Sequence, residues 1–144
     1  LVVDRTYKTL RDEGEKRIQP MLMNLADPSP GLGWRGVERP TLLQRGRPDL
    51  VLCLAVIHHL AITNTVPLAE FVGWLAEVGS ETVVEFPTRE DPMVKILLRN
   101  KRSGLFDGYN LAAFESILAE RFDIRAREEL PSGTRVLFHA TPRG

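Results

Sequence analysis

The chain has 144 residues, of which 43% are hydrophobic and 26% are charged. These proportions are typical of a globular domain with one core, so a single domain is expected. Lysine plus arginine and aspartate plus glutamate each number 19, which argues against a general attraction to nucleic acid or to an anionic membrane. No apolar stretch is long enough to cross a membrane, so a membrane partner is not expected either.

The single cysteine, Cys53, lies within the apolar run 50–54. A buried free thiol that behaves as a small hydrophobe is expected there, rather than a nucleophile. One unpaired cysteine also favours a reducing, cytoplasmic setting for the protein.

The first segment predicts an amphipathic helix over 2–12, because apolar side chains recur there at helical spacing: Val3, Tyr7 and Leu10. Gly14 follows as a C-terminal stop. The next segment, 18–23, is short and apolar. Because Pro20 cannot donate to a strand ladder, we expect this segment to be an edge strand.

The stretch from Asp27 to Pro48 is rich in glycine and proline, which predicts a long loop with a helical turn at 41–44. The run that follows, 49–57, is continuously apolar after its first residue. Such a run is typical of a strand buried on both faces in a parallel sheet. We expect it to be the central strand.

Helices and strands alternate in the remainder of the chain. Helices are predicted over three segments: 67–78, which ends at Gly79; 92–98; and a run that Asn110 caps. Strands are predicted over three more: 82–86, 122–127 and 135–140. The last two should pair antiparallel across a short loop. The pattern indicates an α/β fold, with a mainly parallel sheet, helices on both faces and a C-terminal β-hairpin that adds an antiparallel strand at one edge.

In open α/β sheets, ligands bind beyond the carboxyl ends of the strands. Functional residues are therefore expected just after Met23, Ala55 and Glu85.

Several segments resemble a known family. The run 49–60, which opens with Asp49 and closes with Ala55-Val56-Ile57-His58-His59-Leu60, resembles the fourth strand and following turn of class I S-adenosylmethionine-dependent methyltransferases. Three further segments resemble a bacterial subgroup of that family labelled nodulation-protein-related: 20–30, 85–86 and 90–94. The last helix and hairpin match the family's sixth and seventh strands, the seventh inserted antiparallel. The resemblance implies a Rossmann-like fold, S-adenosylmethionine as cofactor, and methyl transfer to an oxygen or nitrogen of a small or mid-sized substrate.

Two family features are missing from the sequence: the glycine-rich first loop, and the acidic residue that holds the cofactor ribose. We therefore expect residues 1–144 to be the carboxy-terminal two-thirds of a single methyltransferase-like domain without its first two strands. Asp4 could be the ribose residue, but placing it in the helix after the missing strand fits without gaps. Alone, such a chain should bind cofactor weakly, and it should aggregate or pair with another chain, which makes a homo-oligomer possible.

The resemblance implies cofactor contacts from four residues: Asn24, Leu25, Leu54 and Ala55. Asn24 stands where the family usually has an acidic residue beside the adenine, and its amide oxygen could accept from the exocyclic amine. Alternatively, its side chain only caps its own loop. Trp34, in the long loop, could close over the substrate or could simply anchor a surface loop.

His58 and His59 are the sharpest local feature, because they follow the apolar strand. Neighbouring side chains of an extended segment point in opposite directions, so one of the two should face the pocket. The resemblance favours His59 as the proton acceptor, which leaves His58 for substrate contact; alternatively, the histidines only shape the pocket wall. Glu85, which ends its strand, must be paired or face a wet cleft and is the second catalytic candidate. No metal site is expected, because no cysteine or carboxylate has ligand spacing.

Asp91 is best explained as a helix cap. A basic cluster follows it, which could bind an acidic substrate or form a solvated helix face: Lys95, Arg99, Lys101 and Arg102. Two other functions stay open. One is a methyltransferase-like binding module without catalysis, for which the non-acidic Asn24 is the hint. The other is a nicotinamide-dependent oxidoreductase, which would need a Gly-x-Gly-x-x-Gly turn upstream.

Overall fold

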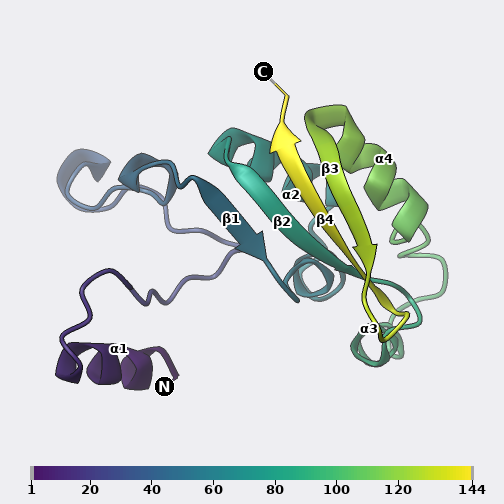
Figure 1. The fold of residues 1–144 in the computed structure, drawn as a ribbon, viewed down its shortest axis with the longest axis horizontal. Coiled ribbons are helices and arrows are strands. Elements are labelled where there is room, and N and C mark those ends of the chain that lie inside the picture. Colours follow the sequence, from purple (N-terminus) through teal and green to yellow (C-terminus); the bar gives the residue numbers. More distant parts are fainter. Residues whose placement is uncertain (1, 144) are drawn as a thin grey trace. The chain divides into compact units, whose positions relative to one another are not determined.

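The computed structural model describes residues 2–143 of the chain. They form two compact units, the first ending at Thr41 and the second beginning at Leu42. Figure 1 shows the elements of both units, coloured in chain order. All strands and most helices belong to the second unit.

Helix α1 (Val2–Asp12) opens the first unit, and its bounds confirm the predicted helix. Gly14 follows with a φ of 70°, a left-handed conformation that glycine adopts readily at the end of a helix. Asp4 lies on this helix and pairs with Lys8 one turn later, with Oδ2 and Nζ 3.1 Å apart. The helical placement of Asp4 is therefore confirmed.

The edge strand expected over 18–23 is wrong, because this segment belongs to no strand of the described sheet. Ile18 and Leu22 are exposed, and Pro20 offers no amide hydrogen. Neither burial nor a hydrogen-bond ladder therefore stabilises an extended pairing at this point.

The long loop is confirmed and contains two short 3-10 turns, η1 (Trp34–Gly36) in the first unit and η2 (Leu43–Arg45) in the second. The second turn overlaps the helical turn expected at 41–44. An isolated pair of backbone hydrogen bonds between Leu32 and Arg39 closes the loop around η1.

The second unit contains a four-stranded sheet. Its strands, in chain order, are β1 (Leu50–Cys53), β2 (Glu81–Pro87), β3 (Phe122–Glu129) and β4 (Arg135–Pro142). Their spatial order is β1-β2-β4-β3, with β1 parallel to β2 and with both pairings of β4 antiparallel. In Figure 1, β1, β2 and β3 therefore run in one direction and β4 runs against them.

Three expectations about the sheet need correction. The sheet is mixed rather than mainly parallel, because only β1 and β2 pair in parallel. The antiparallel strand β4 lies between β2 and β3, and not at an edge, because the hairpin docks its second strand on β2. Finally, β1 is an edge strand of the described sheet and not its central strand.

Strand β1 is also shorter and less buried than expected. It ends at Cys53 instead of extending to Ile57, because Ala55 takes a φ of 55° and turns the chain out of the strand. Leu50 and Leu52 are 46% and 60% exposed, so burial on both faces is wrong for the described residues. Cys53 itself is buried, as expected, and burial raises the pKa of its thiol to about 11.

Local signals correctly place the α-helices of the second unit: α2 (Leu68–Val78), α3 (Pro92–Leu98) and α4 (Leu111–Arg121). Gly79 ends α2 in the left-handed conformation. Asp91 caps α3 by accepting from Met93 N, and Asn110 caps α4 by accepting from Ala113 N. All three caps were predicted from sequence.

The core of the second unit lies on one face of the sheet. Phe114 of α4 is fully buried, with its ring 4.7 Å from that of Phe86 on β2 and 5.6 Å from that of Phe138 on β4, centroid to centroid. Helices α2 and α4 pack against each other on this face. Leu137 and His139, which alternate with the buried positions of β4, are only half-buried. The second helical layer expected on the other face is therefore not seen within residues 42–143.

Among residues 2–143, no helix combines the length and apolar character that a membrane crossing requires.

Candidate functional site

The candidate site is built where β1 ends. After Cys53 the left-handed Ala55 reverses the chain, a helical turn begins at Ile57, and the π-helical turn η3 (His59–Thr63) continues it. The histidines are thus helical, and the expectation of an extended segment with opposed side chains is wrong. Their ring centroids lie 4.2 Å apart, tilted by 40°. π-helical turns are rare and often lie at functional sites.

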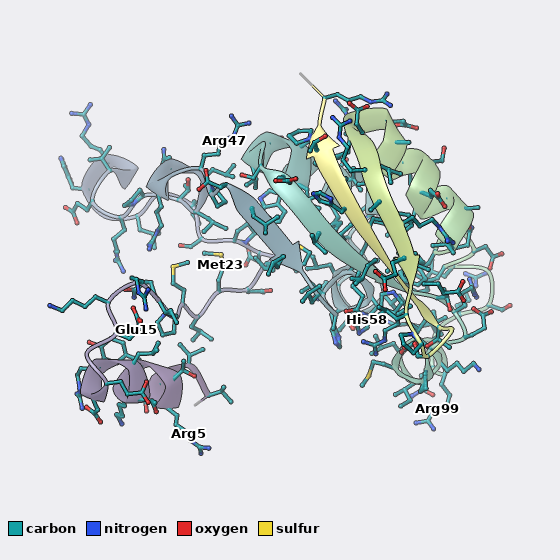
Figure 2. All side chains as sticks on the ribbon, viewed as in Figure 1. Arg5, Glu15, Met23, Arg47, His58 and Arg99 are labelled. Carbon is teal, nitrogen blue, oxygen red and sulfur yellow. The ribbon has the colours of Figure 1, made fainter. Side chains whose placement is uncertain are left out.

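The two histidines differ sharply in exposure. His59 is exposed, whereas His58 is 2% exposed and its Nδ1 is buried without a hydrogen-bond partner in the structure. Figure 2 shows His58 beside the helical turns that follow β1. Burial lowers the pKa of His58, and the neighbouring His59 and Arg135 lower it further, against the opposing effect of Asp91 and Glu85. His58 is therefore held as a neutral imidazole.

This burial predicts a specific loss of stability in mild acid. Below the ordinary pKa of 6.5, the unfolded chain binds a proton at His58 that the folded chain does not bind. The free energy of unfolding should therefore fall as pH drops from 6.5 toward the lowered pKa, by at most about 1.4 kcal/mol per pH unit. Urea unfolding at a series of pH values measures the slope. The variant His58→Gln should flatten it, and an unchanged slope in that variant would contradict the assignment.

Glu85 lies at the carboxyl-end half of β2, and the structure shows it paired. Its Oε1 accepts from Nη1 of Arg135 at 2.7 Å, and Nε of the same arginine donates to Oδ2 of Asp91, also at 2.7 Å. The side chains of Glu85 and Asp91 are 9% and 2% exposed. One guanidinium therefore pairs with two buried carboxylates and ties β2, the start of α3 and the start of β4 together.

Asp91 has two roles in this network. Burial alone would raise its pKa, but the hydrogen bonds from Arg135 and from the backbone N–H of Met93 outweigh that effect and hold the pKa below its usual value. Sequence reasoning found the cap and missed the ion pair. Arg135 carried no sequence signal, since its partners precede it by 50 and 44 positions and meet it only through strand pairing.

Ala55, expected to contact the cofactor, lies at the most strained point of this turn. Its φ of 55° is a left-handed conformation that costs a residue with a Cβ about 1 kcal/mol or more. Ala55→Gly should therefore raise the free energy of unfolding by up to about 1 kcal/mol, after the greater flexibility of glycine in the unfolded chain is subtracted. Urea unfolding is the measurement. Ala76→Gly within α2 is the matched control and should lower stability by about 1 kcal/mol; a loss at both positions would refute the strain.

The remaining expected residues lie elsewhere. Leu54 is 48% exposed directly before Ala55 in the second unit. Asn24, Leu25 and Trp34 belong to the first unit. Oδ1 of Asn24 accepts from the backbone N–H of Ala26 at 3.1 Å, which is the loop-capping contact that we gave as the alternative to adenine binding. Trp34 is 77% exposed on η1.

His58, His59, Glu85 and Ala55 all belong to the second unit. The structure adds two residues to this group, Asp91 and Arg135, whose charges act on His58. Within residues 2–143, no group of three histidine, cysteine, aspartate or glutamate side chains could hold a metal ion.

The chain is similar to part of a nodulation protein. It is 36% identical over 135 residues to the nodulation protein NoeA of Rhizobium meliloti strain 1021, and the match covers 94% of the chain. The chain spans only 27% of the length of that relative. No protein-family model and no solved structure matches it. The resemblance to nodulation-related proteins is therefore confirmed, whereas methyl transfer remains a proposal.

Proposed function

We propose that these residues form the carboxy-terminal part of a Rossmann-like methyltransferase domain. This domain would transfer a methyl group from S-adenosylmethionine to an oxygen or nitrogen of a small or mid-sized molecule. The single observation that carries the proposal is the position of β4. It is antiparallel and inserted between β2 and β3, as the resemblance to the family's inserted seventh strand requires.

The position of the histidine pair adds support. In α/β sheets the ligand lies beyond the carboxyl ends of parallel strands, and both the histidines and the Arg135 network lie just beyond or at the ends of β1 and β2. A strained turn, a π-helical turn and a buried imidazole without a partner are together found there. Such features cluster at functional sites more often than elsewhere.

The described residues fit one side of a cofactor site. Leu54 and Ala55 offer exposed apolar surface at the tip of β1, where they would contact the adenosyl part of S-adenosylmethionine. In the first unit, Asn24 and Leu25 are the further candidates, although Asn24 already caps its own turn. The cofactor supplies an activated methyl group on a sulfonium. The chain itself supplies alignment of the acceptor, which is a large part of the acceleration in transfer reactions.

His59 is the proposed proton acceptor, because it is exposed and its backbone is fixed. Its carbonyl oxygen accepts from both N and Nδ2 of Asn64, at 3.1 and 3.0 Å. An imidazole in such a position can take a proton from a hydroxyl or amine as that group is methylated. His58, packed against it and 2% exposed, would hold its ring in place rather than contact the substrate. Glu85 is the second candidate for contact with the substrate, although Arg135 already occupies one of its oxygens.

A second function, binding without catalysis, is favoured by one specific observation. Glu85 and Asp91 are both engaged by Arg135, which gives this network a purely structural explanation. On this alternative the domain would bind S-adenosylmethionine or its acceptor without transferring the methyl group.

Titration calorimetry with S-adenosylhomocysteine tests the proposal. The protein is the R. meliloti relative with its matched segment replaced by residues 2–143, alongside the unaltered relative. We expect saturable binding to both proteins, and methyl transfer to at least one acceptor in a panel of phenols, amines and carboxylates. His59→Ala should slow that transfer about a hundredfold or more without weakening S-adenosylhomocysteine binding. His139→Ala, a half-buried histidine on β4, is the matched control.

Two results decide between the alternatives. No heat of binding with either protein would overturn methyl transfer altogether. Binding of S-adenosylhomocysteine without product from any acceptor would favour the non-catalytic module.

A further inference from the structure

A hollow with apolar walls opens on the second unit. It measures about 430 Å³ and lies among the start of α2, the segment 105–109 and α4. Its walls include Ala61, Val66, Leu68 and Ile117. A volume of this size falls in the range of roughly 300–1,000 Å³ that is usual for small-molecule sites.

A second, smaller hollow of about 120 Å³ shares one lining residue with the first and has a different chemistry. Three cationic side chains and one carboxylate line it: Arg89, Lys101, Arg102 and Asp107. Phe106 contributes to both hollows. The ammonium of Lys101 stands 5.7 Å from the centre of the Phe106 ring, which places a positive charge where the apolar and the cationic hollow meet.

The segment that joins the two hollows is fixed by hydrogen bonds. The carbonyl oxygen of Phe106 accepts from Nη1 of Arg89 at 2.7 Å and from the backbone N–H of Tyr109 at 2.9 Å. The hydroxyl of Tyr109 donates to the carbonyl oxygen of Pro87 at 2.7 Å, which ties the segment to the end of β2. A site that is already formed does not have to be ordered when a ligand binds.

One wall carries further strain. Thr65, beside α2, has a φ of 57°, which is an outlier for a β-branched residue. Strained backbone conformations persist where the surroundings impose them and are concentrated at ligand sites.

We propose that the two hollows together bind a small amphipathic anion. Its aliphatic or aromatic body occupies the apolar hollow, and its carboxylate or phosphate lies against Lys101 and Arg102. The excess of two positive charges in the smaller hollow selects the anion over a neutral or cationic molecule of the same shape. This inference rests on the proposed function only in one respect: the bound anion would then be the methyl acceptor or a close analogue of it.

Calorimetric titration of the 144-residue chain tests the inference with four ten-carbon compounds, each used below its micelle concentration. They are decanoate, decyl phosphate, decanol and decyltrimethylammonium. We expect both anions to bind at least about tenfold more tightly than the cation, with decanol between them. Equal affinity for the cation and the anions, or binding by none of the four compounds, would overturn the proposal.

Matched variants separate the two hollows. The double variant Lys101→Glu/Arg102→Glu should weaken both anions about tenfold and leave decanol unchanged. Ala69→Trp, which fills the apolar hollow from an exposed position on α2, should weaken all three ligands that bind, and Ala69→Leu should do so to a smaller extent. Arg99→Glu reverses one charge at the residue that follows α3, outside both hollows, and should change nothing (Figure 2).

Three results would refute this arrangement: no effect of Ala69→Trp, an effect of Arg99→Glu as large as that of the double variant, or binding to phosphatidylglycerol vesicles but not to the free anions. The last result would identify a membrane lipid as the source of the anion. Retained S-adenosylhomocysteine binding in the relative carrying these residues would show that only the ligand class, and not the proposed function, had failed.

Discussion

Replacing Arg135 with leucine is expected to lower the free energy of unfolding by about 3 kcal/mol. The reason is that the substitution leaves the carboxylates of Glu85 and Asp91 buried without their cation. An unpaired buried charge costs several kilocalories per mole, whereas the intact pair adds little net stability. The predicted loss is thus a cost of breaking the network and not the strength of two hydrogen bonds.

Urea unfolding followed by circular dichroism measures this loss, and two further variants identify its cause. Arg127→Leu removes an arginine from a surface pair with Glu115 and should cost no more than about 1 kcal/mol. Adding Glu85→Gln to the Arg135→Leu chain removes one of the stranded charges and should restore part of the stability. A double variant less stable than Arg135→Leu alone would show that the buried charges are not responsible.

The network also adds an acid limit to stability. The pKa of Asp91 is lowered in the folded chain, so its contribution is fully present above its ordinary pKa of 3.8 and is lost as pH falls toward the lowered value. The loss of stability from Asp91 therefore begins at a lower pH than the loss from His58, which begins at 6.5.

Phe114→Ala should cost about 4 kcal/mol of unfolding free energy. The side chain of Phe114 is fully buried between the rings of Phe86 and Phe138, so truncation removes both ring contacts and leaves a cavity that the two strands cannot close. Thermal and urea unfolding both report the loss. Trp34→Ala removes a larger but 77% exposed ring and should change stability by no more than about 0.5 kcal/mol.

Phe114→Leu refines the test, since leucine refills part of the space and should recover more than half of the loss. A cost for Phe114→Ala no greater than that for Trp34→Ala would mean that α4 is not packed on the sheet as described.

The local elements were accessible from sequence because their signals lie within a few residues of each other. Asp91, Asn110 and Gly79 mark helix ends through contacts that span two to four positions, and each occurs where it was predicted. The same holds for the hairpin, whose strands are joined by a short loop. Strand ends were less accessible: the apolar run 49–57 gives no sign that Ala55 turns left-handed, so the predicted strand extended to Ile57 instead of ending at Cys53.

The residues of the candidate site could be named from the sequence, but their arrangement in three dimensions could not. The sequence pointed to His58, His59 and Glu85, and the structure brings them together with Arg135 at the ends of β1 and β2. The burial of His58 instead of His59 followed from the helical geometry of this segment, which the sequence pattern had suggested was extended. Whether Glu85 is free or paired depended on a residue 50 positions away.

Composition, hydrophobic period and capping residues were sufficient to identify an α/β chain, its helices, its closing hairpin and the segment that carries the histidines. Only the tertiary structure decided the strand order β1-β2-β4-β3, the burial of His58 and the capture of two carboxylates by Arg135. The physical reason is the distance along the sequence over which each kind of interaction acts. Backbone propensity and capping act between neighbours, whereas strand insertion and ion pairing depend on residues that become neighbours only after the sheet has formed.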